Sequence, residues 1–233
     1  MSDDLPSIGA ATTRATDGAD PCTGPVCGAP TARRDARWHA AARTARILSW
    51  VSLLWMTGEG ALGLVAGAAS GSISLIGWAL GSAIEGLASI IVIWRFTGTR
   101  TLSETAEGRA RKAVAVSFFL LAPYLGVESV RDLLIGHAAT TSVLGIAVTS
   151  TSLLVMPLLG VVKQRLGQRL DSGATSGEGA QNLLCAAQAA AVLTGLALYA
   201  LLGWWWVDPV VGLGLAAIAL REGRTAWRGD DCC

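Results

Sequence analysis

Six long apolar stretches dominate the chain. Each is roughly 17–25 residues long, the length that an α-helix needs to cross a bilayer, and each carries at most one charged residue. They cover residues 47–69, 73–94, 113–130, 143–162, 183–202 and 204–220. One such run also fits a buried helix of a soluble protein, but six in series favour a membrane protein. We therefore predict an all-α integral membrane fold, a six-transmembrane-helix bundle.

The composition agrees with this fold and excludes several classes of protein. Hydrophobic residues make up 52% of the 233 residues and charged residues 15%, against roughly 25% charged in soluble proteins. This hydrophobicity excludes a chain that is disordered throughout. The formal net charge is +1, which argues against a nucleic-acid partner, because such a protein needs a basic surplus.

The apolar pattern also divides the chain. Residues 1–42 are rich in Asp, Thr, Gly, Pro and Ala, and we expect a disordered cytosolic tail without a signal peptide. Residues 43–228 form the predicted transmembrane domain. Residues 229–233 form a short cytosolic end that contains Cys232 and Cys233.

The basic residues predict the orientation. In a six-helix threading, the tail, the 2–3 and 4–5 loops and the end share one side, where most Lys and Arg lie: Arg33, Arg34, Arg37, Arg43, Arg46, Arg95, Arg100, Arg109, Arg111, Lys112, Lys163, Arg165, Arg169, Arg221, Arg224 and Arg228. The opposite side has short links and the cluster 204–206 of three Trp residues. Because cytoplasmic loops retain Lys and Arg, we expect a multi-pass protein of the cell membrane with both termini cytosolic.

Polar side chains inside the predicted spans are the candidates for chemistry, because such groups are costly in a membrane. Glu59 and Glu85 lie in the middle of the first two spans, and Cys185 lies in the fifth. Gln181 and Cys185 share a helix face, and Glu178 lies one turn further back. Carboxylate oxygen and thiolate sulfur suit a divalent ion such as zinc. The alternatives are that Cys185 is a small buried apolar residue and that Gln181 only bonds a neighbouring helix.

Four segments resemble the cation diffusion facilitator (cation efflux) family or a subgroup of it. Residues 71–85, GSISLIGWALGSAIE, are similar to its second helix, and the segment 178–185 falls where its fifth helix supplies ligands. The sequence GWWWVDP at 203–209 and AWRG at 226–229 resemble a short bacterial subgroup of cation transporters that lacks the C-terminal soluble domain. Asp208 and Pro209 also suit a helix start, with Asp208 as the capping residue.

The resemblance implies exchange of a divalent cation, usually zinc, for protons, commonly by a homodimer. In the family, helices 2 and 5 each supply two metal ligands. The first pair falls here on Gly81 and Glu85, and the second on Gln181 and Cys185. Gly81 has no side chain and Gln181 is neutral, which departs from the family pattern and leaves Glu59, Glu178 or a water to complete the shell.

Two functions follow from these residues. The first is a divalent metal cation transporter whose partners are the metal ion, protons and the lipid bilayer, with no permanently bound cofactor. The alternative is a non-transporting interaction or regulatory membrane protein that kept the fold. An enzyme is not expected, because no nucleophile–base pairing or phosphate-binding Gly motif is present.

The remaining Cys and His residues lie near the ends of the spans or beyond them. Cys22, Cys27, Cys232 and Cys233 are either reduced thiols or a cytosolic trap for metal ions. His39 and His137 are expected to be surface residues.

Overall fold

The computed structural model describes residues 35–70, 73–136 and 143–229. The links predicted at 70–72 and 136–141 lie largely outside these ranges, as do Cys22, Cys27, His137, Cys232 and Cys233. The described residues form six α-helices, one short 3₁₀-helix and no strand. The elements are α1 (Ala36–Ser70), α2 (Ile73–Arg95), η1 (Gly98–Leu102), α3 (Glu104–Ile135), α4 (Val143–Leu170), α5 (Gly173–Leu202) and α6 (Val207–Arg228).

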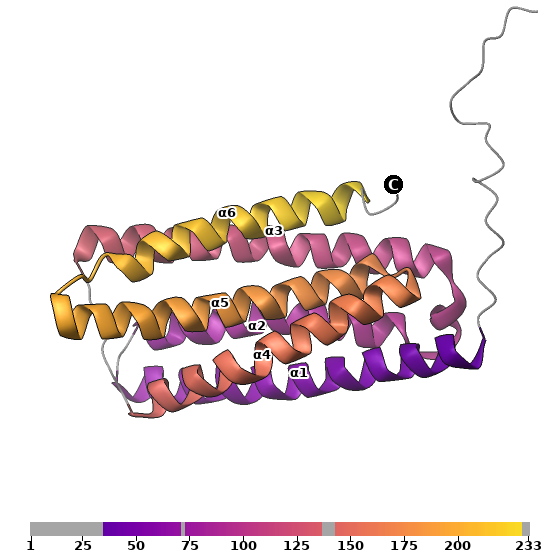
Figure 1. Ribbon diagram of the computed structural model, residues 1–233, viewed down its shortest axis with the longest axis horizontal. Coiled ribbons are helices and arrows are strands. Elements are labelled where there is room, and N and C mark those ends of the chain that lie inside the picture. The colour runs from indigo at the N-terminus through magenta and orange to yellow at the C-terminus, as the bar shows by residue number, and fades with distance from the viewer. Residues whose placement is uncertain (1–34, 71–72, 137–142, 230–233) are drawn as a thin grey trace, which may run out of the picture. The chain divides into compact units, whose positions relative to one another are not determined.

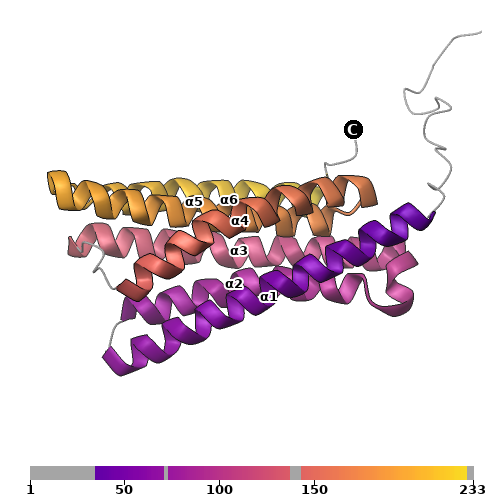
Figure 2. The ribbon, with the colours of Figure 1, turned by 60° about the horizontal axis from the view of Figure 1, so that its bottom comes forward.

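The six helices run roughly along one direction, each antiparallel to the next (Figure 1). The most extensive contacts are those of α4 with α5, α3 with α6, and α1 with α2. Helix α4 crosses the bundle at an angle and packs on α5 and α1, as Figure 2 shows. Helices from both halves of the sequence therefore share one interior.

The helices extend beyond the apolar stretches that predicted them. Helix α1 begins at Ala36, inside the segment expected to be a tail, where an oxygen of Asp35 accepts a hydrogen bond from the Trp38 amide at 2.9 Å. Helix α4 continues to Leu170, so Lys163, which was expected in a loop, lies within the helix. The physical reason is that hydropathy marks the apolar part of a helix, whereas caps and turns mark its ends.

Polar side chains fix the ends of α3 and α5. The Ser103 hydroxyl accepts from the Ala106 amide, and the Ser172 hydroxyl accepts from the Thr175 amide. The prediction that Asp208 caps α6 was wrong. The N-cap is Trp206, whose side chain makes no capping hydrogen bond, and Asp208 lies in the first helical turn.

A buried ion pair joins α2 to α3 and α5. The guanidinium of Arg95 lies 2.6 Å from the carboxylate of Glu107. The same carboxylate accepts from the Ser172 hydroxyl at 3.0 Å and from the Ala174 amide at 3.1 Å. Glu107 thus holds the start of α5 against the end of α2.

Besides an apolar core, the bundle has many large apolar side chains exposed on its surface. Leu134 is 82% exposed and Leu201 80% exposed, whereas Lys163 and Glu178 are fully buried. Soluble proteins bury their large apolar residues and rarely bury charges. A lipid environment accounts for the exposed apolar surface, because the exposed Leu side chains are then in contact with acyl chains.

Within the described residues, four helices are long and apolar enough to cross a membrane. These candidate spans are Ala36–Val65, Glu104–Ile135, Ile146–Leu170 and Gly173–Leu202. The all-helical fold is thus confirmed, as are several apolar helices of spanning length. The role of α2 and α6 as further spans stays a prediction.

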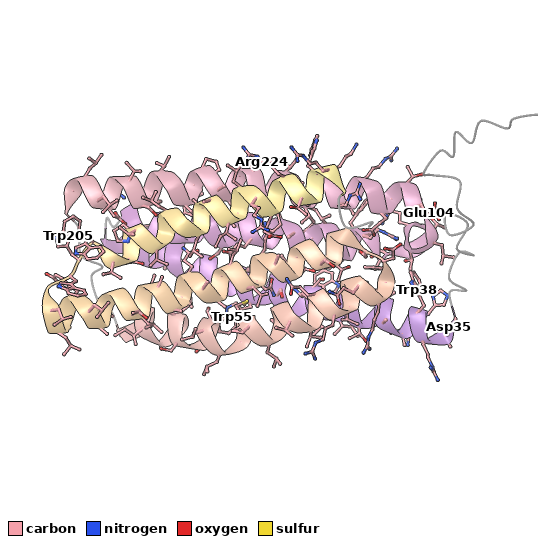
Figure 3. The ribbon with its side chains drawn as sticks, turned by 45° about the horizontal axis from the view of Figure 1, so that its top comes forward. Asp35, Trp38, Trp55, Glu104, Trp205 and Arg224 are labelled. Atoms are coloured by element: carbon pink, nitrogen blue, oxygen red, sulfur yellow. The ribbon has the colours of Figure 1, made fainter. Side chains whose placement is uncertain are left out.

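Figure 3 shows what lies at each end of the helices. Asp35, Trp38 and Glu104 lie at one end and Trp205 at the other, and side chains with nitrogen atoms gather toward the end that carries Glu104. Trp204 and Trp206 stack with ring centroids 5.9 Å apart. This separation of basic side chains from the Trp cluster is the arrangement on which the predicted orientation depends.

Candidate functional site

The middle of the bundle brings together two carboxylates and a thiol from three helices. Glu59 comes from α1, Glu85 from α2 and Cys185 from α5. The Cys185 thiol lies within hydrogen-bonding reach of the Glu85 carboxylate, and Glu59 is close enough to act electrostatically on both. We call these three residues the central cluster. The sequence predicted each as a candidate ligand; the fold brings Glu85 and Cys185 within reach of each other and leaves Glu59 near both.

The surroundings of the central cluster are mostly apolar. Met56, Met156 and Leu159 are buried in one cluster with Cys185. The Ser152 hydroxyl donates to Glu59 Oε1 at 3.3 Å and itself accepts a hydrogen bond from Trp55 Nε1 at 3.2 Å. In such surroundings two nearby negative charges are costly, and a cation or protons that balance them are favoured.

A second group of buried polar residues from α1, α4 and α5 lies further toward the start of α5 than Cys185. Lys163 Nζ is 2.7 Å from Glu178 Oε1 and 2.5 Å from Ser52 Oγ. The Ser49 hydroxyl donates to Glu178 Oε2 at 2.6 Å, and Asn182 Nδ2 donates to Ser52 Oγ at 3.1 Å. We call these five residues the lysine cluster. Seven residues separate Glu178 from Cys185, which is about 10 Å along a helix.

The other two predicted ligand positions face α3. Gln181 Nε2 donates to Ser117 Oγ at 2.9 Å, and its buried Oε1 has no hydrogen-bond partner among the described residues. A Cβ at Gly81 would stand 3.0 Å from Cε1 of Tyr124. An acidic residue at position 81 therefore needs the Tyr124 ring to move.

The family ligand set stays a prediction. Glu85 and Cys185, one from each predicted pair, meet in the central cluster, whereas Glu178 is engaged by Lys163. Among the described residues, no three His, Cys, Asp or Glu side chains are already arranged to hold one metal ion. A complete coordination shell would thus need the central cluster to close around the ion.

Sequence reasoning missed the residues that contact the predicted ones. Ser49, Ser52 and Glu59 recur at helical spacing on α1, as do Ser152 and Lys163 on α4. Their spacing of three, seven and eleven residues places each set on one helix face. Polar residues that recur at this spacing within an apolar stretch are the sequence signal from which these contacts could have been predicted.

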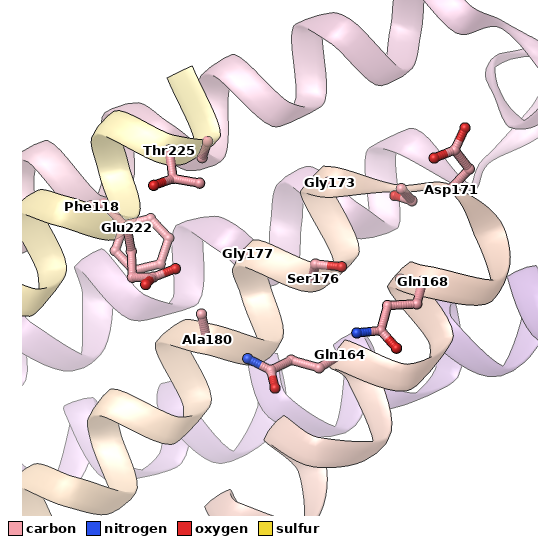
Figure 4. Close-up of a pocket in the computed structure, with 13 residues that line it drawn as sticks. Phe118, Gln164, Gln168, Asp171, Gly173, Ser176, Gly177, Ala180, Glu222 and Thr225 are labelled. Atoms are coloured by element: carbon pink, nitrogen blue, oxygen red, sulfur yellow. The ribbon is translucent and has the colours of Figure 1, made fainter. Parts of the chain in front are cut away.

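A cavity of about 470 Å³ lies among α3, α4, α5 and α6 (Figure 4). Polar side chains line it: Gln164, Gln168, Asp171, Ser176, Glu222 and Thr225. Asp171 belongs to the turn between α4 and α5, so this cavity lies toward the end of the bundle at which that turn is found.

Comparison with known proteins finds similarity to a protein named as a transporter. A scan against protein-family models finds no match. The chain is 26% identical over 195 residues to a protein of Synechocystis sp. named "Uncharacterized transporter sll1263". The match covers 80% of this chain and 63% of the relative, so the chain spans less than two thirds of the relative's length. Together with the apolar helices, this similarity suggests a multi-pass membrane protein.

Proposed function

We propose that the protein is a membrane transporter that exchanges a divalent metal cation for protons, with the central cluster as its ion-binding site. The observation that supports the proposal is the approach of Glu85 of α2 to Cys185 of α5 inside an apolar bundle, with the carboxylate of Glu59 near both. The transporter relative and the sequence resemblance to cation efflux proteins support the same class of function.

The chemistry of the central cluster explains how ion and proton movement would be coupled. Carboxylate and thiolate bind a metal ion only in their deprotonated forms, so metal binding releases protons. When one divalent cation binds Glu85 and Cys185, each group gives up one proton, and two positive charges replace two. The reverse step loads the protons and releases the ion. Glu59 acts on this balance electrostatically.

Zinc is the cation that we expect first. Zn²⁺ binds oxygen and sulfur ligands and accepts four-coordinate sites, whereas Mg²⁺ and Ca²⁺ prefer oxygen alone. Gly81 and Gln181 then contribute less than the corresponding residues of cation efflux proteins. The proposed transporter moves the ion out across the cell membrane, has both termini in the cytosol and works as a homodimer.

Transport by purified protein in vesicles tests the proposal. We would measure flux of zinc, cadmium, cobalt, iron and manganese under an imposed pH gradient, for wild type, Glu85→Gln and Glu59→Gln. Glu85→Gln should abolish flux, because it removes a ligand and an exchangeable proton, and Glu59→Gln should only weaken it. Glu104→Gln is the matched control, because this residue is exposed at one end of α3.

Two results would contradict the proposal. Flux that survives Glu85→Gln intact removes the central cluster from the mechanism. If the wild type carries none of the five ions, the result favours the alternative of a non-transporting membrane protein.

A further inference from the structure

The lysine cluster already holds a cation, namely the ammonium of Lys163. Its Nζ lies 2.7 Å from Glu178 Oε1 and 2.5 Å from Ser52 Oγ. The side chains of Lys163 and Glu178 are 0% and 1% exposed. These oxygens therefore balance a positive charge in a place that water does not reach.

The oxygen atoms around the ammonium come from two other helices. Glu178 belongs to α5, Ser49 and Ser52 belong to α1, and Lys163 alone comes from α4. Ser49 and Asn182 hold the Glu178 carboxylate and the Ser52 hydroxyl in place through hydrogen bonds. Carboxylate and hydroxyl oxygens are hard ligands, which suit ions such as Mn²⁺, Mg²⁺ or Ca²⁺.

A further acceptor lies on α5 at a level between the lysine cluster and the central cluster, on the side of the helix that faces α3. Gln181 is one turn beyond Glu178 and one turn before Cys185 on α5, and it is 1% exposed. Its Oε1 has no hydrogen-bond partner among the described residues. Buried polar atoms of this kind normally have a partner, so an acceptor is available at this level of α5.

We propose that the oxygens of Glu178 and Ser52 form a second cation subsite, which the Lys163 ammonium fills when no transported ion is present. The inference rests on the proposed transport function, because it makes the subsite a station about 10 Å along α5 from the central cluster. Lys163 is then a tethered competitor of the ion. An ion takes the subsite only when the ammonium leaves it.

Binding of Mn²⁺ to the purified protein in detergent tests the subsite without any transport. Mn²⁺ is the probe because it accepts oxygen ligands and because its electron paramagnetic resonance signal changes when it binds. Lys163→Met removes the competitor and keeps an unbranched side chain. Lys112→Met is the matched control, because Lys112 is exposed on α3. Lys163→Gln carries the same test if Lys163→Met does not give folded protein.

The folded Lys163 variant should bind one Mn²⁺ per chain in addition to any that wild type and Lys112→Met bind. Its affinity for this additional ion should be at least tenfold higher than that of the same subsite in wild type. Adding Glu178→Gln should remove this ion, and adding Glu85→Gln should retain it. The subsite is refuted if the Lys163 variants bind no additional Mn²⁺, if the additional ion survives Glu178→Gln, or if it disappears with Glu85→Gln.

The outcome is separable from that of the flux assay. A wild type that carries no ion in vesicles, together with an additional Mn²⁺ in Lys163→Met, refutes the transport function and leaves the subsite. Flux that depends on Glu85, without additional Mn²⁺, refutes the subsite and leaves the transport function.

Discussion

The buried pair of Lys163 and Glu178 allows a quantitative prediction. At the observed separation of 2.7 Å, the attraction between unit charges is about 6 kcal/mol for an effective dielectric constant near 20. Desolvation of both groups offsets most of it, so the pair itself contributes little net stability. Removing one partner is different, because it leaves the other charge buried alone.

Lys163→Met and Glu178→Gln should therefore each lower the free energy of unfolding by about 3–5 kcal/mol. The double variant should cost no more than either single variant, because no uncompensated charge remains. The measurement is a double-mutant cycle of unfolding free energies in mixed micelles, followed by circular dichroism. The pair Arg131 and Glu128 is the control, because its atoms are 3.5 Å apart and both side chains are about a third exposed.

The control variants, Arg131→Met and Glu128→Gln, should each cost at most about 1 kcal/mol. The reasoning is refuted if the Lys163 and Glu178 variants are as mild as these, or if their effects simply add in the double variant.

Three further predictions concern orientation and packing. With the terminal cysteines replaced, Trp205→Cys should react with an impermeant maleimide from outside intact cells and Glu104→Cys should not; the reverse pattern would exclude both termini from the cytosol. A Cβ at Gly160 would stand 2.7 Å from Cγ of Leu183 and 2.9 Å from the carbonyl oxygen of Gly179. Gly160→Ala should therefore lower the free energy of unfolding by about 1–3 kcal/mol, whereas Gly214→Ala, with open space around it, should not destabilise the protein. Asp208→Asn should retain most ion flux, because Asp208 packs against Gly195 of α5 outside the central cluster; loss of flux at normal expression would assign Asp208 to the ion path.

The apolar pattern predicted the helices well and their ends poorly. All six helices were predicted in the right order, because each contains a long apolar run that favours a buried or lipid-facing helix. The polar ends carry no such run. Lys163 shows the consequence: a charge after an apolar run was taken as the start of a loop, although the helix continues and buries the charge against Glu178.

The site was predictable only in part. Helical spacing predicts that Gln181 and Cys185 share one face of the helix, but it does not say which partner helix each meets. Cys185 meets Glu85 of α2, whereas Gln181 bonds Ser117 of α3. That difference depends on the rotation of α5 and on the crossing of α4, which arise from packing between distant segments.

Simultaneous measurement of zinc and proton movement in vesicles tests the central claim most directly. Purified protein would be reconstituted with a zinc indicator and a pH indicator inside the vesicles. We predict that zinc movement in wild type is accompanied by proton movement in the opposite direction, and that Glu85→Gln abolishes both while Glu104→Gln changes neither. Zinc movement without any counterflow of protons, or an undiminished counterflow in Glu85→Gln, would contradict the claim.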